Sequence, residues 1–422
     1  MTDPRLVENV TCLGCGCGCD DLTVRISNER IVEVTPACSL GRAWFGDGQV
    51  PSQVLSEGRP VALDDALRQM AEHLMQSRGR CLVYLGSDLT SQAQRAALGI
   101  ADLLEATVQS ETSDTAAQGI AVAQRRGRAS ATLGEIRNRG DVFLFWGVDP
   151  RERYPRFLAR YSLEPVGVQV PEGRGGRFVM SVSIGNDNAL DPADRSFSLT
   201  PDQEIEVLTL TRAAILGNRV TARSSIEAPA AELADRLLRA RYAVVVHDAE
   251  PTAEPRNPLR AEALIALTQT LNGPTRAALC SLRTGGNRVG AESVLTSQTG
   301  YPFAVDYSSG YPRYRPERGP ALGQGGRFTA ALVVGTVSGS ESARAALSNL
   351  QPAVIGPRAS QGQLSPRIAV DTGVAGIHEA GTAYRMDEVP LSLRQCLDGP
   401  PATVEVLTSL ARVIRGRLPR GR

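Results

Sequence analysis

The sequence predicts an α/β protein in which open parallel sheets follow a small, cysteine-containing, β-rich N-terminal module. Short apolar runs alternate with helical patterns along most of the chain, which is typical of parallel sheets. Leu22 to Val34 alternates apolar and polar residues around a turn at Ser27-Asn28-Glu29, as a β-hairpin does. At 422 residues the chain exceeds the size at which one hydrophobic core stops growing, so two or three compact units are expected.

Periodicity assigns the elements of the parallel sheets in order. Helical spacing of apolar residues predicts a helix over Asp65 to Ser77, a buried strand over Cys81 to Gly86 and a second helix over Ser91 to Glu105. Similar strands are predicted at Val142 to Gly147, Tyr242 to His247, Ala330 to Gly335 and Ala353 to Gly356, with a terminal helix over Thr403 to Arg415. We expect ligands near the exits of these strands, because open α/β sheets bind ligands there.

Composition excludes several function classes. A formal net charge of +1 gives no field that would attract nucleic acid or an anionic membrane over long range. No apolar run approaches the ~20 residues needed to span a bilayer. Met1 to Cys12 shows no basic region followed by an apolar stretch, as export would require. We therefore expect a cytoplasmic protein whose cysteines are reduced thiols.

Four N-terminal cysteines have the spacing of an inorganic centre. Cys12, Cys15, Cys19 and Cys38 give C-x2-C-x3-C-x18-C, with Cys17 between the second and third. Closely spaced cysteines let one loop wrap a centre, while a distant fourth thiolate closes it. Four thiolates suit a [4Fe–4S] cluster or tetrahedral Zn²⁺, and an empty, reduced loop is the third alternative.

The other cysteines and the histidines carry weaker signals. Cys81, Cys280 and Cys396 are scattered among apolar residues and are predicted to be buried core thiols. His73 is predicted to lie at the surface of a helix. His247 leaves a predicted strand and His378 adjoins Glu379, but no H-x-H or H-E-x-x-H pattern is present, so a histidine metal site is not expected.

The chain resembles a known family. A C-x2-C-x3-C…C module ahead of interleaved α/β domains is similar to the molybdenum and tungsten pterin oxidoreductases of the formate dehydrogenase and DMSO reductase type. Further motifs resemble, more narrowly, the B subunit of formylmethanofuran dehydrogenase. They are Cys12 to Asp21, Thr132 to Ile136, Trp146 to Pro150, Tyr154 to Arg156, Arg160 to Ser162, Thr299 to Pro302, Gly310 to Tyr314 and Glu379 to Asp387. The resemblance covers nearly the whole chain.

Two departures from the family pattern concern its redox cofactor. In the family, a Cys or selenocysteine followed by His binds the metal in the loop after the second helix of the first α/β unit. Here Glu111 to Gly119 contains no thiol, and Ala116 or Ala117 stands at the ligand position. The family's pterin-contacting Asp-Pro-Arg is also missing from Val179 to Asn186. No tungsten or molybdenum pterin is therefore expected.

The resemblance implies a function without redox chemistry. The chain looks most like the B subunit of the bacterial formyltransferase/hydrolase complex, which takes part in tetrahydromethanopterin-linked oxidation of formaldehyde to formate. It would scaffold the amidohydrolase-like A subunit and the C and D subunits, and help enclose a furan-type formyl carrier. One alternative is an active formylmethanofuran dehydrogenase subunit with a tungsten or molybdenum pterin. Another is a subunit that binds the carrier in the former pterin cleft.

Arginine is the expected contact to the carrier. The sequence contains no lysine, so all 46 basic residues are arginine. Carriers of this type bear glutamate chains, whose carboxylates guanidinium groups bind in bidentate fashion. The first candidates are Arg313, Arg315, Arg318 and Arg385.

The expected domain organisation is discontinuous. The cysteine module is predicted to cover 1–52. One α/β domain would combine 53–120 with 306–422, and a second would be inserted at 121–305, as in molybdopterin oxidoreductases without the C-terminal barrel.

Overall fold

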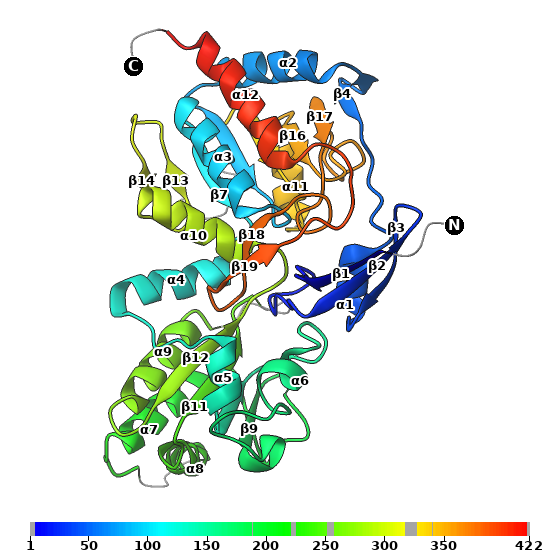
Figure 1. The fold of residues 1–422 in the computed structure, drawn as a ribbon. Coiled ribbons are helices and arrows are strands. Elements are labelled where there is room, and N and C mark those ends of the chain that lie inside the picture. Colours follow the sequence, from blue (N-terminus) through cyan, green and yellow to red (C-terminus); the bar gives the residue numbers. More distant parts are fainter. Residues whose placement is uncertain are drawn as a thin grey trace. The chain divides into compact units, whose positions relative to one another are not determined.

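The computed structural model describes residues 5–187, 189–220, 225–250, 257–316, 327–339 and 341–419. Their contacts divide the chain into unit 1, Met1–Thr112 with Gly285–Arg422, and unit 2, Ser113–Thr284. Helices alternate with parallel strands in both units, which confirms the predicted fold class (Figure 1). The three-part division with boundaries at 52, 120 and 305 stays a prediction.

Unit 1 is built on a nine-stranded sheet. In spatial order its strands are β14 (Arg313–Tyr314), β13 (Val305–Asp306), β7 (Thr107–Ser110), β6 (Cys81–Leu85), β15 (Ala330–Val334), β16 (Ala353–Gly356), β17 (Ile368–Asp371), β4 (Val54–Ser56) and β5 (Arg59–Pro60). The strands from β7 to β17 are parallel, and antiparallel strands flank them on both sides. Because the strand order reverses between β6 and β15, the loops after these strands diverge, which is where such sheets bind ligands.

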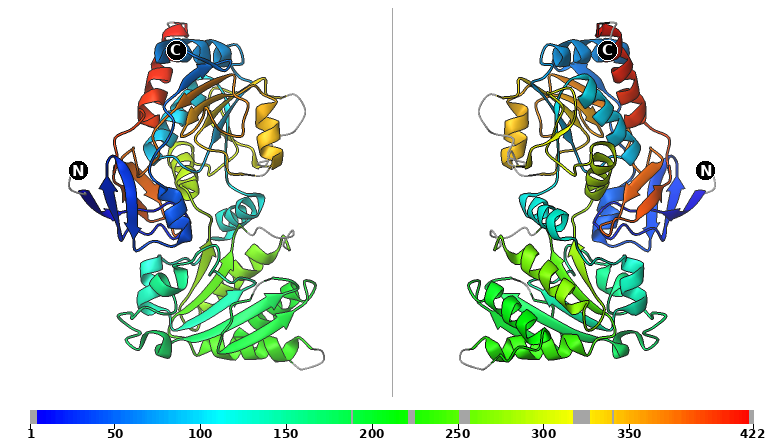
Figure 2. Two further views of the ribbon diagram at one scale, coloured as in Figure 1. Left: turned by 90° about the vertical axis from the view of Figure 1, so that its right-hand side faces the viewer. Right: turned by 90° about the vertical axis from the view of Figure 1, so that its left-hand side faces the viewer.

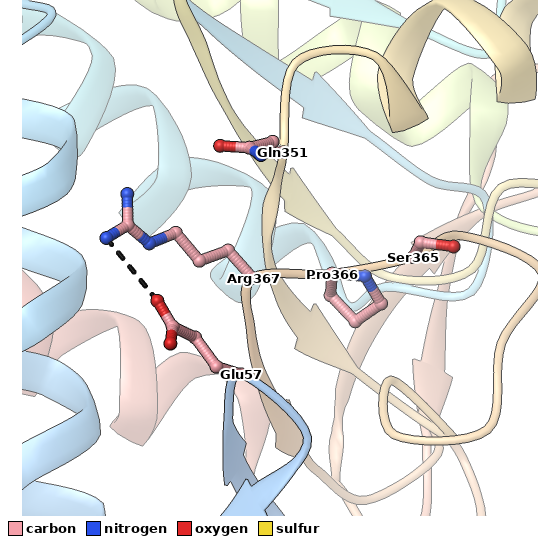
Figure 3. A pocket seen from close by; sticks show the side chains of 5 residues that line it. All are labelled: Glu57, Gln351, Ser365, Pro366 and Arg367. Carbon is pink, nitrogen blue, oxygen red and sulfur yellow. Dashed lines mark ion pairs between the residues drawn. The ribbon is translucent and has the colours of Figure 1, made fainter.

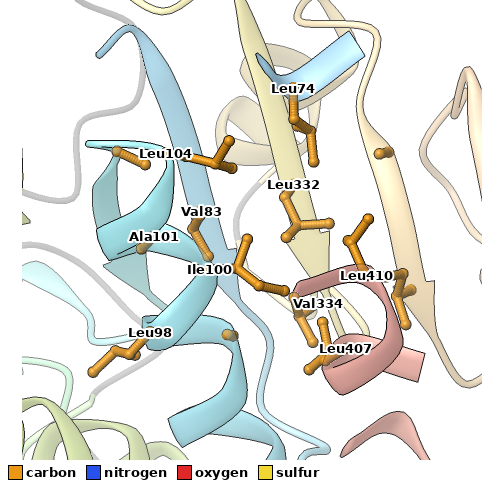
Figure 4. Packing of buried hydrophobic residues seen from close by; sticks show 14 of the residues in the cluster. Leu74, Val83, Leu98, Ile100, Ala101, Leu104, Leu332, Val334, Leu407 and Leu410 are labelled. Carbon is orange, nitrogen blue, oxygen red and sulfur yellow. The ribbon is translucent and has the colours of Figure 1, made fainter. Parts of the chain in front are cut away.

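Helices cover both faces of this sheet because each central strand is apolar on both sides. Val83 and Leu85 of β6 pack with α2 (Leu63–Met75), α3 (Ser91–Leu103), α10 (Arg288–Thr299) and α12 (Thr403–Arg417). Leu82 and Tyr84 face the opposite side, where α11 (Glu341–Ser348) contributes Leu347. Figure 4 shows Leu332 and Val334 of β15 close to Leu407 and Leu410 of α12. Helix α12 also packs against α2 and α3 (Figure 2).

The N-terminal module of unit 1 is a three-stranded antiparallel sheet. It consists of β1 (Arg5–Val10), β2 (Leu22–Ser27) and β3 (Arg30–Thr35), followed by α1 (Ser39–Phe45). Strands β2 and β3 form the predicted hairpin. A second hairpin, β18 (Gly381–Tyr384) and β19 (Pro390–Leu393), contributes Ala383 and Leu393 to a small core with Leu13, so the two ends of the chain share this region.

Unit 2 contains a five-stranded, fully parallel sheet. Its strands are β10 (Arg195–Leu199), β9 (Phe178–Ile184), β8 (Val142–Trp146), β11 (Ala243–Asp248) and β12 (Ala277–Leu282) in spatial order. The helices are α4 (Asp114–Arg126), α5 (Leu133–Arg139), α6 (Phe157–Tyr161), α7 (Glu204–Ile215), α8 (Glu227–Leu238) and α9 (Arg260–Leu271), with a 3₁₀ turn at Gly173–Gly176. The strand order reverses between β8 and β11, which gives unit 2 a strand-exit site of its own.

No helix within the described residues has the length and apolar character that a membrane crossing requires.

Candidate functional site

The predicted cysteine loop is a closed turn between β1 and β2. The backbone N–H of Cys12 donates to the Cys19 carbonyl at 2.8 Å, and that of Gly18 donates to Cys15 at 3.3 Å. Cys38 reaches the loop from the residue before α1. A Cβ at Gly41 would lie 3.5 Å from Cys12 Sγ and 3.9 Å from Cys38 Sγ. The first turn of α1 therefore lies close to two of the thiols.

The structure brings the four predicted cysteines together as thiols. Cys12, Cys15 and Cys19 are buried, and Cys38 is partly exposed. Burial raises the pKa of the Cys12 thiol far above its ordinary value, and the charges of the other three raise that pKa further. The donors are of the kind that Fe–S clusters and Zn²⁺ prefer. Across the described residues, however, no group of three or more His, Cys, Asp or Glu is arranged so that it could hold a metal ion.

The remaining cysteines lie in the core, as the sequence predicts. Cys81 in β6 is fully buried, and burial raises its pKa to about 12. Cys280 in β12 is 5% exposed. Cys396 is also buried, which raises its pKa to about 11, and its thiol lies 3.6 Å from the Gly376 carbonyl. These thiols act as small apolar groups.

Among the predicted carrier contacts, Arg385 lies against the cysteine loop. It makes a bidentate ion pair with Asp387, with N···O distances of 2.7 and 2.8 Å. A Cβ at Gly18 would lie 3.0 Å from Arg385 Cγ, so the arginine stem packs on the loop. The backbone N–H of Met386 donates to the Gly16 carbonyl at 3.1 Å and ties the β18–β19 hairpin to the same loop.

The other predicted arginines lie on a different element of unit 1. Arg313 in β14 places its guanidinium 4.8 Å from the ring centre of Tyr311, which is exposed. The backbone N–H of Arg315 donates to the Ala304 carbonyl at 2.9 Å. Arg318 lies outside the described residues. The described members of the predicted set are thus distributed between the β13–β14 edge and the β18–β19 hairpin.

The histidines occupy three separate environments. His73 in α2 is partly exposed, as predicted. His247 in β11 is buried, and its Nε2 lies 2.8 Å from Ser281 Oγ. Burial is the main cause that lowers the pKa of His247 to about 3, and the charge of Arg260 lowers it further. The Nδ1 atom of His378 accepts a hydrogen bond from the Val374 N–H at 3.1 Å, and burial lowers its pKa. Burial also lowers the pKa of His73, so all three are mainly neutral at pH 7.

The two departures from the family pattern lie in regular structure of unit 2. Ala116 and Ala117 are in the first turn of α4, and both are buried. Ser113 caps this helix, because its Oγ accepts from the Ala116 N–H at 3.2 Å. The segment that lacks Asp-Pro-Arg begins within β9. Both positions offer side chains without a thiol or guanidinium.

A buried carboxylate that periodicity did not single out lies at the strand exits of unit 1. Glu111 follows β7, and its side chain is 1% exposed. It accepts hydrogen bonds from the backbone N–H groups of Ser338 and Gly339 and from the Ser338 hydroxyl. Arg288 at the start of α10 lies 3.1 Å from the same carboxylate. We call this group the Glu111 cluster.

Unit 2 has a buried ion-pair group at the equivalent edge of its sheet. Glu204 accepts hydrogen bonds from Trp146 Nε1, at 2.8 Å, and from Arg260. Both terminal nitrogens of Arg260 lie 3.4 Å from Asp187 Oδ2. Gly147 adopts a φ of +58°, and a Cβ there would lie 2.7 Å from that same oxygen. We call this group the Arg260 cluster.

A surface pocket of about 420 Å³ lies away from these groups in unit 1. Figure 3 shows its lining residues, Glu57, Gln351, Ser365, Pro366 and Arg367. Arg367 and Glu57 form an ion pair across it at 3.6 Å. It contains none of the predicted site residues.

The comparisons with known proteins find relatives of one kind. No family model matches the chain. Two curated relatives are both named as the B subunit of tungsten-containing formylmethanofuran dehydrogenase 2. The protein from Methanocaldococcus jannaschii is 29% identical and covers 98% of this chain and 100% of its own length. The protein from Methanococcus maripaludis is 28% identical, over 94% of this chain and 95% of its own.

Among solved structures, a chain of the formyltransferase/hydrolase complex from Methylorubrum extorquens, determined with methylofuran, has a TM-score of 0.70. It is 23% identical and matches 86% of this chain and 99% of its own. The structural match supports the fold, and the sequence matches confirm the resemblance that the motifs indicate. Along nearly its whole length, the chain is similar to curated formylmethanofuran dehydrogenase B subunits.

Proposed function

We propose that the chain is a non-redox B subunit of a formyltransferase/hydrolase complex. The observation that carries this proposal is the pair of buried alanines, Ala116 and Ala117, in the first turn of α4. In the related dehydrogenases this position supplies the thiolate or selenolate ligand of the redox metal. Methyl groups cannot ligate a metal, so the residues here do not fit a tungsten or molybdenum pterin. Ordinary side chains provide no two-electron centre for oxidising a formyl group.

The protein would act by assembly and enclosure. The M. extorquens complex with the same fold was solved with methylofuran. By analogy, this chain would scaffold A, C and D subunits and help enclose a furan-type carrier, while hydrolysis to formate takes place on the A subunit. The carrier's carboxylates would bind to guanidinium groups, for which Arg313, Arg315, Arg318 and Arg385 remain the proposed residues.

Metal analysis of the complex purified through this chain tests the central claim. We expect formate production from a formyl-tetrahydromethanopterin donor with far less than one tungsten or molybdenum per complex. One of these metals in stoichiometric amount would overturn the proposal. It would favour the second candidate, a tungsten-dependent dehydrogenase, which the names of the curated relatives support.

Two substitutions at one ion pair test the carrier contact. Arg385→Ala removes a guanidinium that could bind carboxylates. Asp387→Asn breaks the same ion pair but keeps that guanidinium. If Arg385 binds the carrier, Arg385→Ala raises KM for the carrier about tenfold and Asp387→Asn leaves it near wild type. Equal effects of the two variants would mean that the pair only stabilises the hairpin. Arg313→Ala with an unchanged KM would remove that arginine from the proposed set.

The cysteine cluster is proposed to stabilise the N-terminal module, with a [4Fe–4S] cluster, Zn²⁺ or no metal. Iron and zinc quantification after anaerobic purification distinguishes these states. Cys12→Ala should lower the unfolding midpoint if a bound metal joins the loop to Cys38. An unchanged midpoint together with absence of both metals would mean that the motif is an empty, reduced cysteine loop without a stabilising role.

A further inference from the structure

The loop after β15 donates backbone hydrogen bonds to two carboxylates, those of Asp88 and Glu111. This loop, residues 335–339, begins at Gly335 with a φ of +81°, where a Cβ would lie 2.6 Å from Asp88 Oδ1. The Thr336 N–H donates to that oxygen at 2.7 Å. Further along the loop, the N–H groups of Ser338 and Gly339 both donate to one oxygen of Glu111.

Side chains complete this arrangement around Glu111. The Ser338 hydroxyl donates to the second carboxylate oxygen. Arg288 places Nη2 3.1 Å from that oxygen and 2.9 Å from Ser338 Oγ. Adjacent backbone N–H groups, a hydroxyl and a guanidinium, at the carboxyl end of a parallel strand, are the elements from which proteins build phosphate sites. In this chain those donors hold one of its own carboxylates.

Burial shows that the carboxylate belongs to this site. The Glu111 side chain is 1% exposed and that of Arg288 is 13% exposed. A buried carboxylate is tolerated only when charge and hydrogen bonds replace its hydration, and Glu111 has three hydrogen-bond donors and one cation. The same donors would be left unsatisfied if the carboxylate were absent. Donors and acceptor are thus matched.

We propose that Glu111 is a built-in ligand that fills an anion site and blocks phosphate-bearing compounds from the strand exits of unit 1. The site is formed by Ser338, Gly339 and Arg288, and its ligand class is a phosphate or phosphate ester. This inference rests on the geometry of unit 1 alone, so its failure would not affect the proposed function of the complex.

Removing the carboxylate should expose the site to an external anion. We would measure thermal unfolding of the full-length chain, with any partner subunits that co-purify, in sodium phosphate and in sodium chloride of equal ionic strength. Glu111→Ala should unfold at a lower temperature than wild type in chloride. Phosphate at about ten times its Kd should raise that midpoint by about 2 to 3 °C beyond the shift seen for wild type. Phosphate also stabilises folded proteins in general because it is excluded from their surfaces. The shift of the wild-type midpoint measures this general effect and is subtracted.

Two matched variants separate a specific site from a mere cavity. Glu379→Ala removes another buried carboxylate of unit 1, which Thr90 and Thr403 hold with a hydroxyl and a backbone N–H, and phosphate should not rescue it specifically. Adding Arg288→Met to Glu111→Ala should abolish the phosphate effect, because the cation is lost. Titration calorimetry with inorganic phosphate should detect binding to Glu111→Ala at least about tenfold tighter than to wild type.

Three results would overturn the proposal. The first is a folded Glu111→Ala chain that binds phosphate no better than wild type. The second is equal rescue of Glu111→Ala and Glu379→Ala, which would reduce the effect to general salt stabilisation. The third is a Glu111→Ala chain that fails to fold during expression and also on refolding in phosphate, because a phosphate that fits the site would replace the missing charge.

Discussion

The strand exits of the two parallel sheets are both filled by buried arginine and carboxylate groups, but they are held differently. In unit 1 the Glu111 carboxylate receives two backbone N–H groups and a hydroxyl in addition to Arg288. In unit 2 Glu204 receives its hydrogen bonds, among the described residues, from the side chains of Trp146 and Arg260. The unit 1 carboxylate therefore depends less on its arginine.

The two clusters also differ in the ratio of carboxylates to guanidinium groups. The Arg260 cluster has two carboxylates, Glu204 and Asp187, close to one guanidinium. The Glu111 cluster has one carboxylate close to the guanidinium of Arg288. A buried charge without its partner is strongly destabilising. Unit 2 should accordingly be sensitive to loss of its arginine, and unit 1 should tolerate the equivalent loss.

The largest expected effect is that of Arg260→Met. It leaves the buried carboxylate of Glu204 without the guanidinium that pairs with it, so we expect the free energy of unfolding to fall by about 3 to 5 kcal/mol. Urea unfolding followed by Trp146 fluorescence, in a Trp44→Phe background, reports on unit 2. Arg239→Met, in an exposed pair with Asp235 on α8, is the control and should change stability by less than about 1 kcal/mol. Equal losses in both variants would refute the assigned role of Arg260.

The next effect concerns pH and the histidine beside the Arg260 cluster. Burial, and then Arg260, lower the pKa of His247 to about 3, against about 6.5 in the unfolded chain. Below about pH 6.5 the unfolded state binds a proton that the folded state does not, so stability falls as pH falls from about 6.5 toward 3. Between about pH 7 and pH 5 the free energy of unfolding should fall by about 2 kcal/mol because of His247.

Urea unfolding at the two pH values measures this contribution. His247→Gln should show a pH-dependent loss smaller by that amount. Ser281→Ala removes the hydroxyl beside the imidazole but keeps the histidine, so it should retain the full dependence. If His247→Gln loses as much stability at the lower pH as wild type, the histidine is protonated in the folded state.

The smallest effect should come from Arg288→Met, the counterpart of Arg260→Met in unit 1. Glu111 keeps the Ser338 and Gly339 N–H groups and the Ser338 hydroxyl, so we expect the free energy of unfolding to fall by only about 1 kcal/mol. Trp44 fluorescence reports on unit 1 when the chains with and without Arg288→Met both carry Trp146→Phe. A loss as large as that of Arg260→Met would show that backbone donors do not replace the guanidinium, and the comparison of the two units would fail.

Much of the fold could be predicted from sequence because the central strands are short, continuous apolar runs. The strands predicted at Cys81 to Gly86 and Ala353 to Gly356 agree with β6 and β16 to within one residue. The four residues Thr-Val-Gln-Ser of β7 carry no such pattern, and they form a strand because β6 and β13 pair with them. Strand β1 likewise forms by pairing with β2.

The sequence by itself determined which chemical groups the site contains. The C-x2-C-x3-C-x18-C spacing located the cysteine cluster, and the thiol-free segment from Glu111 to Gly119 identified the missing ligand. These are statements about residue identity at positions close in the chain, which need no knowledge of tertiary contacts.

Only the tertiary structure decided which charges meet. Glu111 reaches Ser338 across 227 positions and Arg288 across 177, while Arg260 reaches Glu204 across 56. Such contacts follow from the order of strands in each sheet, because parallel strands bring the loops that follow them to one edge. Strand order depends on long-range pairing that local apolar patterns do not encode. A carboxylate that sequence alone places at a loop start is therefore, in the folded chain, the centre of a filled anion site.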